Sequence, residues 1–144
     1  MKFSIFILVL FSTVLTSCKT YYENPQEIKY NCILEKDQFF SEIKDILTDE
    51  GYDVKVADNI RGYMISDKKV KNKKGKEVIL NISIRYDMET LEYFVTPSAL
   101  VQPRAENQVE YYTTSVMRKE YKQYFLGTLT RIENFCKGGY FPNQ

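Results

Sequence analysis

The three cysteines of this 144-residue chain, Cys18, Cys32 and Cys136, are its side chains with the widest range of chemistry. A cysteine can act as a nucleophile, bind zinc, carry a lipid or form a disulfide. The chain has no histidine, which excludes Ser-His-Asp and Cys-His catalysis and imidazole metal sites. It also has no glycine-rich phosphate loop. We therefore expect no catalytic residue, no metal site and no cofactor.

Other reactive side chains have ordinary spacing. Ser66 and Lys68 lie two residues apart, which is common along a strand and weak evidence for a Ser-Lys pair. Asp45, Asp49 and Glu50 could bind a cation late on a helix, but a solvated helix face explains them better. We interpret these residues as structural.

The first seventeen residues have the pattern of an export signal. Lys2 precedes a mostly apolar run, Phe3–Leu15, which as a helix spans roughly 20 Å. That is shorter than the roughly 30 Å hydrocarbon core of a bilayer, so a signal peptide is favoured over a transmembrane helix. Leu15-Thr-Ser-Cys18 resembles the lipobox of bacterial lipoproteins. An ordinary secretory signal with an incidental cysteine is the alternative.

The lipobox resemblance implies cleavage before Cys18 and lipid on its sulfur. Two or three acyl chains would give stable membrane anchoring. Residues 18–31 are then a lipidated tether, and residues 32–144 form a single domain. In enterobacterial lipoproteins an aspartate after the lipidated cysteine favours retention in the inner membrane, so Lys19 favours the outer membrane. The 127 remaining residues carry 19 basic and 19 acidic side chains, a balance that argues against a nucleic-acid partner.

Cys32 and Cys136 are the two cysteines left for the folded domain. In an exported protein such a pair predicts one disulfide. A loop on the order of 100 residues would gain roughly 4.7 kcal/mol in the chain-entropy model. Two separate buried thiols are the alternative.

Hydrophobic periodicity predicts the elements that carry these residues. A helix is expected over 38–50, with Asp37 as its N-cap and Gly51 after its end. Four strands follow, over 52–57, 62–67, 77–86 and 91–101. Pro97 predicts an edge or a bulge in the last strand. A connector over 103–113 leads to a second helix, whose apolar stripe includes Met117, Tyr121, Phe125, Leu129, Ile132 and Cys136.

The predicted order is therefore α-β-β-β-β-α. With four antiparallel strands between them, the start of the first helix and the end of the second lie at the same end of the domain. Cys32 and Cys136 are located at these two points, so the topology and the disulfide support each other.

A helix followed by Gly51-Tyr-Asp-Val54 and by Gly62-Tyr-Met-Ile-Ser66 resembles the helix-grip domains of small envelope lipoproteins, the BamC-like domains. The resemblance covers about residues 32–137 and rests on element order and loose patterning. It implies an α+β fold, with two helices packed on one face of a four-stranded antiparallel sheet. Such domains usually act as scaffolds or contact modules and share no active site.

Two surfaces are candidates for contact with a partner. The wetter face of the strand over 77–86 would display one alternating set of side chains, Glu77, Ile79, Asn81, Ser83 and Arg85. A lysine cluster surrounds one hairpin tip and would suit anionic headgroups, although lysines there also discourage edge pairing between strands. The cluster contains Lys68, Lys69, Lys71, Lys73, Lys74 and Lys76.

These features predict a lipid-anchored, non-enzymatic contact or accessory module of the bacterial cell envelope. Its expected partners are the membrane, through the lipid, and another protein or an envelope polymer. Two alternatives stay open. One is an immunity or inhibitor lipoprotein that blocks a toxin or a hydrolase. The other binds a small ligand or a glycan, for example in a groove lined by Tyr63, Tyr86, Tyr93, Tyr111 and Tyr112.

Overall fold

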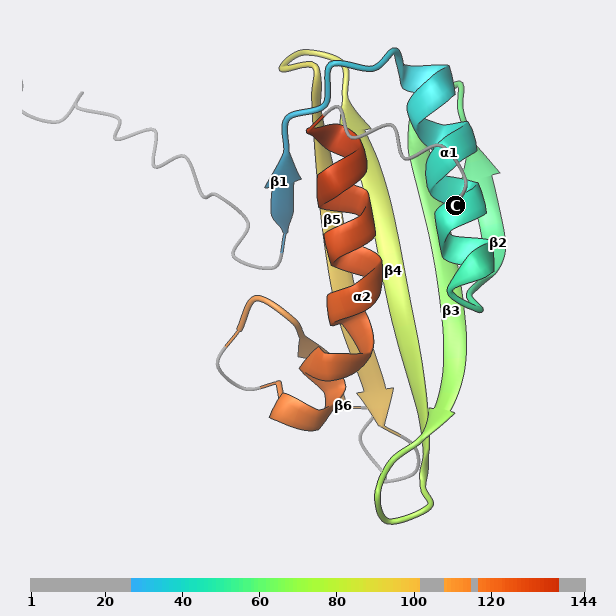
Figure 1. Ribbon diagram of the computed structural model, residues 1–144, viewed down its shortest axis with the longest axis vertical. Helices are drawn as coiled ribbons and strands as arrows, with labels where there is room; N and C mark the ends of the chain where they lie inside the picture. Colours follow the sequence, from blue (N-terminus) through green and yellow to red (C-terminus); the bar gives the residue numbers. More distant parts are fainter. Residues whose placement is uncertain (1–26, 102–107, 115–116, 138–144) are drawn as a thin grey trace, which may run out of the picture.

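The computed structural model describes residues 27–101, 108–114 and 117–137. They form an α+β fold of two helices and one antiparallel sheet (Figure 1). The elements in chain order are β1 (Ile28–Tyr30), α1 (Lys36–Asp49), β2 (Asp53–Asp58), β3 (Tyr63–Lys71), β4 (Glu77–Asp87), β5 (Glu92–Val101), β6 (Gln108–Tyr111) and α2 (Lys119–Cys136).

The sheet has six strands, in the order β1-β5-β4-β3-β2, with β6 also paired to β5. The expected four-stranded sheet is therefore wrong. Strand β1 lies in the segment expected to be a tether, and β6 lies in the segment expected to be a connector. Both are short and pair with the same edge of β5, β1 opposite Tyr93–Val95 and β6 opposite Ser98–Val101.

The helix placement also differs from the expected pair of helices on one face of a four-stranded sheet. Each helix covers a different part of the wider sheet. Helix α1 contacts β2 and lies beside the β2–β3 side of the sheet, whereas α2 lies along β4 and β5 (Figure 1). The two helices also contact each other.

Strand β4 divides its side chains between two environments, as its alternating sequence predicts. Val78, Leu80, Ile82 and Ile84 are each at most 2% exposed. They enter one hydrophobic core with Met64 and Tyr93 of the neighbouring strands and with the apolar stripes of both helices. The alternate residues of β4 are half-buried or exposed and make up the other side of the strand.

Both helices begin without a side-chain cap of their own. Asp37 is not the N-cap of α1, because the helix starts at Lys36, two residues earlier than expected, and Glu35 takes that position. Helix α2 starts at Lys119, with Arg118 as N-cap. The buried Glu110 of β6 accepts a hydrogen bond from the Arg118 backbone N–H at 3.1 Å. Its negative charge complements the positive end of the helix dipole, which ties the start of α2 to β6.

Cys32 and Cys136 lie at disulfide-bonding distance, with their Cα atoms 4.3 Å apart and a sequence separation of 104. This agrees with the expected pairing. Cys136 is the last residue of α2, and Cys32 lies four residues before α1. The bridge therefore joins the segment that enters α1 to the end of α2, at the end of the domain opposite the β3–β4 hairpin.

Loss of this bridge should destabilise the fold strongly. We expect the double variant Cys32→Ser/Cys136→Ser to lose about 2–5 kcal/mol of unfolding free energy, because a cross-link across so long a loop restricts the unfolded chain. Urea unfolding of both proteins, with and without reductant, measures this. Equal stability of the oxidised and reduced wild-type protein would contradict it.

Candidate functional site

The side chains that alternate with the core residues of β3, β4 and β5 form a second, wetter sheet face. On β4 this face carries the five predicted contact residues, Glu77, Ile79, Asn81, Ser83 and Arg85, all of them half-buried or exposed. Strand pairing adds residues from the neighbouring strands to the same face, among them Ile65, Asp67, Phe94, Thr96, Ser98 and Leu100. We call this surface the second face.

Rows of like side chains cross the second face from strand to strand. Ile79 pairs with Leu100, which pairs with Val109 of β6, giving an apolar row over three strands. Val56 pairs with Ile65 in another apolar row, and these two side chains are 37% and 36% exposed. A polar row lies between them, in which Asn81 pairs with both Asp67 and Ser98.

Arg85 is the most highly connected charge on the second face. Its guanidinium lies 4.3 Å from the centre of the Phe94 ring and makes ion pairs with Glu27 at 3.2 Å and Asp87 at 3.1 Å. Partial burial alone would lower the pKa of Arg85, but these two carboxylates outweigh that effect and raise it. Backbone N–H groups of Thr90 and Glu89, followed by Arg85, lower the pKa of Asp87. The stacked arginine is thus held in place as a permanent cation.

The lysine cluster lies on a hairpin that Asn72 organises. Asn72 is 7% exposed, and its side-chain oxygen accepts the backbone N–H groups of Lys74 and Lys76, both at 3.0 Å. Its amide nitrogen donates to the Tyr121 hydroxyl of α2 at 3.4 Å. Gly75, at φ +72°, completes the turn, a conformation that glycine adopts at no steric cost.

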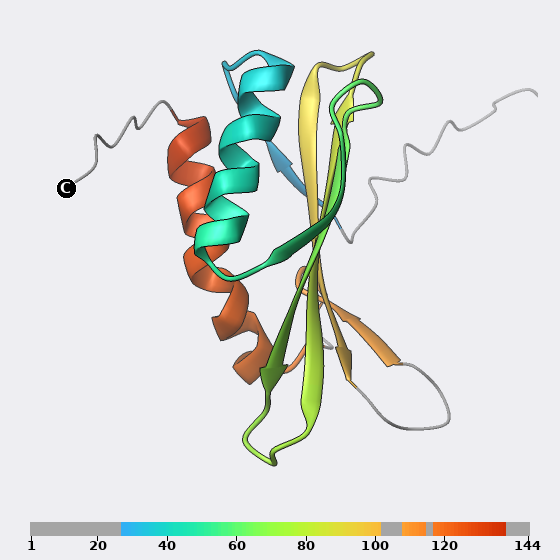
Figure 2. The same ribbon diagram turned by 90° about the vertical axis from the view of Figure 1, so that its right-hand side faces the viewer.

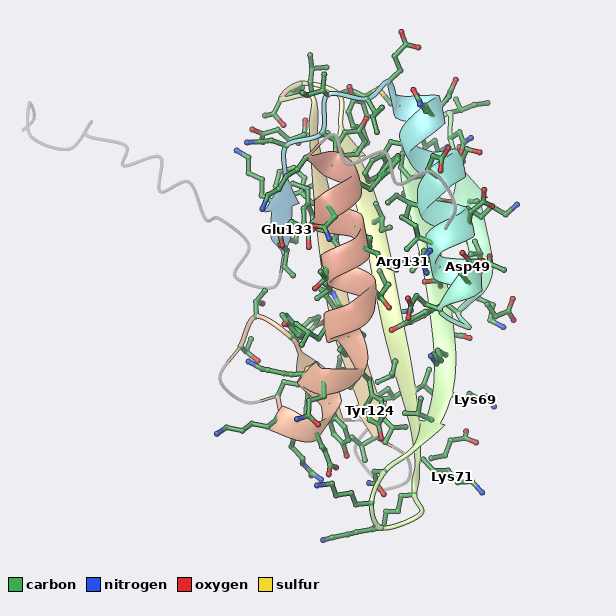
Figure 3. All side chains as sticks on the ribbon, viewed as in Figure 1. Asp49, Lys69, Lys71, Tyr124, Arg131 and Glu133 are labelled. Atoms are coloured by element: carbon green, nitrogen blue, oxygen red, sulfur yellow. A yellow bond between two sulfur atoms is a disulfide. The ribbon has the colours of Figure 1, made fainter. Side chains whose placement is uncertain are left out.

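A second hydrogen bond joins this hairpin to α2: the Tyr124 hydroxyl donates to the Lys71 carbonyl at 3.3 Å. Figure 3 shows Tyr124 on α2 beside the lower part of β3. The hairpin and the first turns of α2 are therefore neighbours, and the hairpin projects beyond the helix (Figure 2).

The structure divides the six predicted lysines into two groups. Lys68 turns back toward α1, where it donates to the Glu50 carbonyl at 2.5 Å and lies over the Tyr52 ring. Lys69 pairs with Glu77 at 3.5 Å. The other four are exposed and make no ion pair with any described residue: Lys71, Lys73, Lys74 and Lys76. We call these four residues the lysine tip.

The reactive groups considered in the sequence are not brought together. The Ser66 hydroxyl is buried and donates to the Ile82 carbonyl, whereas Lys68 points to Glu50. Asp49 and Glu50 pair with Arg131 of α2 at 3.1 and 3.0 Å, so they link the two helices (Figure 3). Within residues 27–101, 108–114 and 117–137, no group of three or more acidic or cysteine side chains is arranged to hold a metal.

The five tyrosines do not share one groove, because strand alternation separates them. Tyr93 is buried against Phe39, with 3.7 Å between ring centres, and donates to the Leu34 carbonyl. Tyr63 and Tyr111 pair with second-face residues instead. Burial raises the pKa of Tyr93 to about 12, which fits a side chain of the core.

Cys18 and the predicted signal segment lie outside the described residues. Neither helix of the described part is long and apolar enough to cross a bilayer. No protein-family model and no curated protein sequence matches this chain. The candidate surfaces are therefore identified from the sequence and structure of this chain alone.

Removing the Asn72 side chain should loosen the hairpin. Asn72→Ala deletes the acceptor for two backbone N–H groups, and we expect the unfolding free energy to fall by about 1–3 kcal/mol. Amide hydrogen exchange at Lys74 and Lys76 should also become faster. The matched control is Asn59→Ala, at an exposed asparagine of another turn. Unchanged exchange at both lysines would show that Asn72 does not order the turn.

Proposed function

We propose that this protein is a lipid-anchored contact module of a bacterial cell envelope that has no enzymatic role. Its second face binds another envelope protein. Lipid on Cys18 holds it on a membrane, and Lys19 favours the outer membrane. The lipobox-like Leu15–Cys18 supports the anchor, and the Cys32–Cys136 pair fits an oxidising compartment outside the cytoplasm.

The observation that carries the contact role is the composition of the second face. It combines partly exposed apolar rows, at Val56–Ile65 and Ile79–Leu100–Val109, with hydrogen-bonding residues between them. It also presents an arginine stacked on an aromatic ring. Arginine and aromatic side chains are enriched at protein interfaces. Their occurrence here beside the apolar rows therefore favours a protein-binding surface.

The helix-grip resemblance points to the same class of function, since its members act mainly as scaffolds or contact modules. This chain departs from that pattern in its sheet, because β1 and β6 widen it. Its added strand β6 also contributes Val109, which is 45% exposed, to an apolar row of the second face. A protein partner that lies across β4, β5 and β6 would bury that row.

The anchor is tested by replacing the lipidated residue. We expect Cys18→Ala protein to leave the membrane fraction and appear in the soluble envelope fraction, because no lipid can then attach. Metabolic labelling with a palmitate analogue should mark the wild type alone. Membrane association of Cys18→Ala protein at the wild-type level would rule out the lipid anchor.

The contact face is tested by site-specific photo-crosslinking in the native envelope. A benzoylphenylalanine at Ile65, on the second face, should capture one protein partner in a discrete adduct identified by mass spectrometry. The control position is Leu126 on α2, which is 57% exposed. Arg85→Glu in the Ile65-labelled protein should reduce the adduct at least several-fold, while Lys44→Glu should leave it unchanged. Equal adducts from Ile65 and Leu126 would contradict a second-face interface.

A further inference from the structure

Basic side chains are concentrated at one end of the domain. The hairpin segment Lys68–Glu77 carries six lysines and one acidic residue. The segment Arg118–Lys122 at the start of α2 adds three basic residues and one acidic residue, and bonds from Tyr121 and Tyr124 place it beside the hairpin. Nitrogen-tipped side chains accordingly project from the lower end in Figure 3.

The acidic groups near this end do not neutralise the lysine tip. Glu110 is buried and paired with Arg118 at 3.6 Å, and Glu77 pairs with Lys69. Glu120, in the first turn of α2, makes no ion pair with a tip lysine among the described residues. The four exposed ammonium groups of the tip are therefore left for an external anion.

The backbone that carries these lysines is ordered before any partner binds. Asn72 closes the turn, and the two tyrosines of α2 attach it to the helix. A partner therefore need not order the turn's backbone when it binds, which lowers the entropic cost of association.

The N-terminal end of β1 points toward the hairpin. Strand β1 is antiparallel to β5, as β4 is, so β1 and β4 run in the same direction, away from the hairpin. Ile28 lies in the same cross-strand row as Met64, and Lys71 is seven residues further along β3, roughly 23 Å at about 3.3 Å per residue.

The length of the preceding chain fits this arrangement. Cys18 and Ile28 are ten positions apart in the sequence, a stretch that can extend to at most roughly 35 Å. That exceeds the roughly 23 Å from the Ile28 row to Lys71. If Cys18 lies in a bilayer surface, the linking segment is therefore long enough for Lys71 to reach the same surface.

We propose that the lysine tip docks on the anionic phospholipid headgroups of the bilayer that holds the Cys18 lipid. This inference rests on the proposed lipid anchor. The tip fixes which end of the domain faces the membrane. In this orientation the disulfide end points away from the membrane. The second face, which runs along the strands, then lies roughly perpendicular to the bilayer and is open to a partner.

Each lysine near an anionic surface contributes on the order of 1 kcal/mol, which is roughly a five-fold change in binding. The interaction should weaken steeply with salt, since screening shortens the range of exposed charges. Four lysines therefore suffice for a measurable interaction without any lipid on the protein.

The test uses the chain from residue 18 with Cys18→Ser, which contains every described residue and carries no lipid. Its flotation is measured with vesicles of phosphatidylcholine alone and of phosphatidylcholine with phosphatidylglycerol. The test variant is K71Q/K73Q/K74Q/K76Q. The control variant K29Q/K44Q/K55Q/K137Q removes the same charge from exposed lysines elsewhere. Thermal unfolding verifies that both variants fold.

We expect binding to the anionic vesicles alone, a loss of at least ten-fold in the bound-to-free ratio for the tip variant, and near wild-type binding for the control. Equal losses in both variants, or no binding by the wild type, would overturn the proposal. Tighter retention on immobilised polyglutamate or duplex DNA than on vesicles at equal salt would also overturn it, by reassigning the tip to an acidic macromolecule. Because the protein here has no lipid, the result is independent of the Cys18→Ala fractionation.

Discussion

The alternation of β4 is the constraint on which the rest of the molecule depends. Burying Val78, Leu80, Ile82 and Ile84 against both helices supplies the centre of the core. The same geometry forces the intervening residues to the other side, since neighbouring strand residues point in opposite directions. The second face is thus a direct consequence of the packing, and a one-residue shift in register would exchange the two faces.

The long elements could be predicted because their periodicity is strong and local. The stripe Phe39, Phe40, Ile43, Ile46 and Leu47 of α1 is buried as expected, and β4 matches its predicted range to within a residue. Strands β1 and β6 could not be found this way, because three or four residues are too few to show a period. They are recognisable only once the free edge of β5 is present for them to pair with.

Pro97 shows how a correct local rule can give an incomplete answer. Proline indicated an edge or a bulge, yet β5 is an inner strand that pairs with β4 on one side and with β1 and β6 on the other. Pro97 lies between the stretches paired with β1 and with β6, and its carbonyl accepts the Tyr112 N–H on that side. The absent N–H therefore faces the gap between two short strands, so the ladder with β4 loses nothing.

The distribution of charge, like the position of Pro97, could be predicted only in part from the sequence. Equal numbers of acidic and basic residues argued against a nucleic-acid partner, but net charge does not record where the charges lie. Tertiary contacts remove Lys68 and Lys69 from the cluster through Glu50 and Glu77, and they bring the basic start of α2 beside the remaining four lysines. Since screening limits exposed charges to interactions within about 10 Å, this local excess, and not the neutral total, decides what the hairpin end attracts.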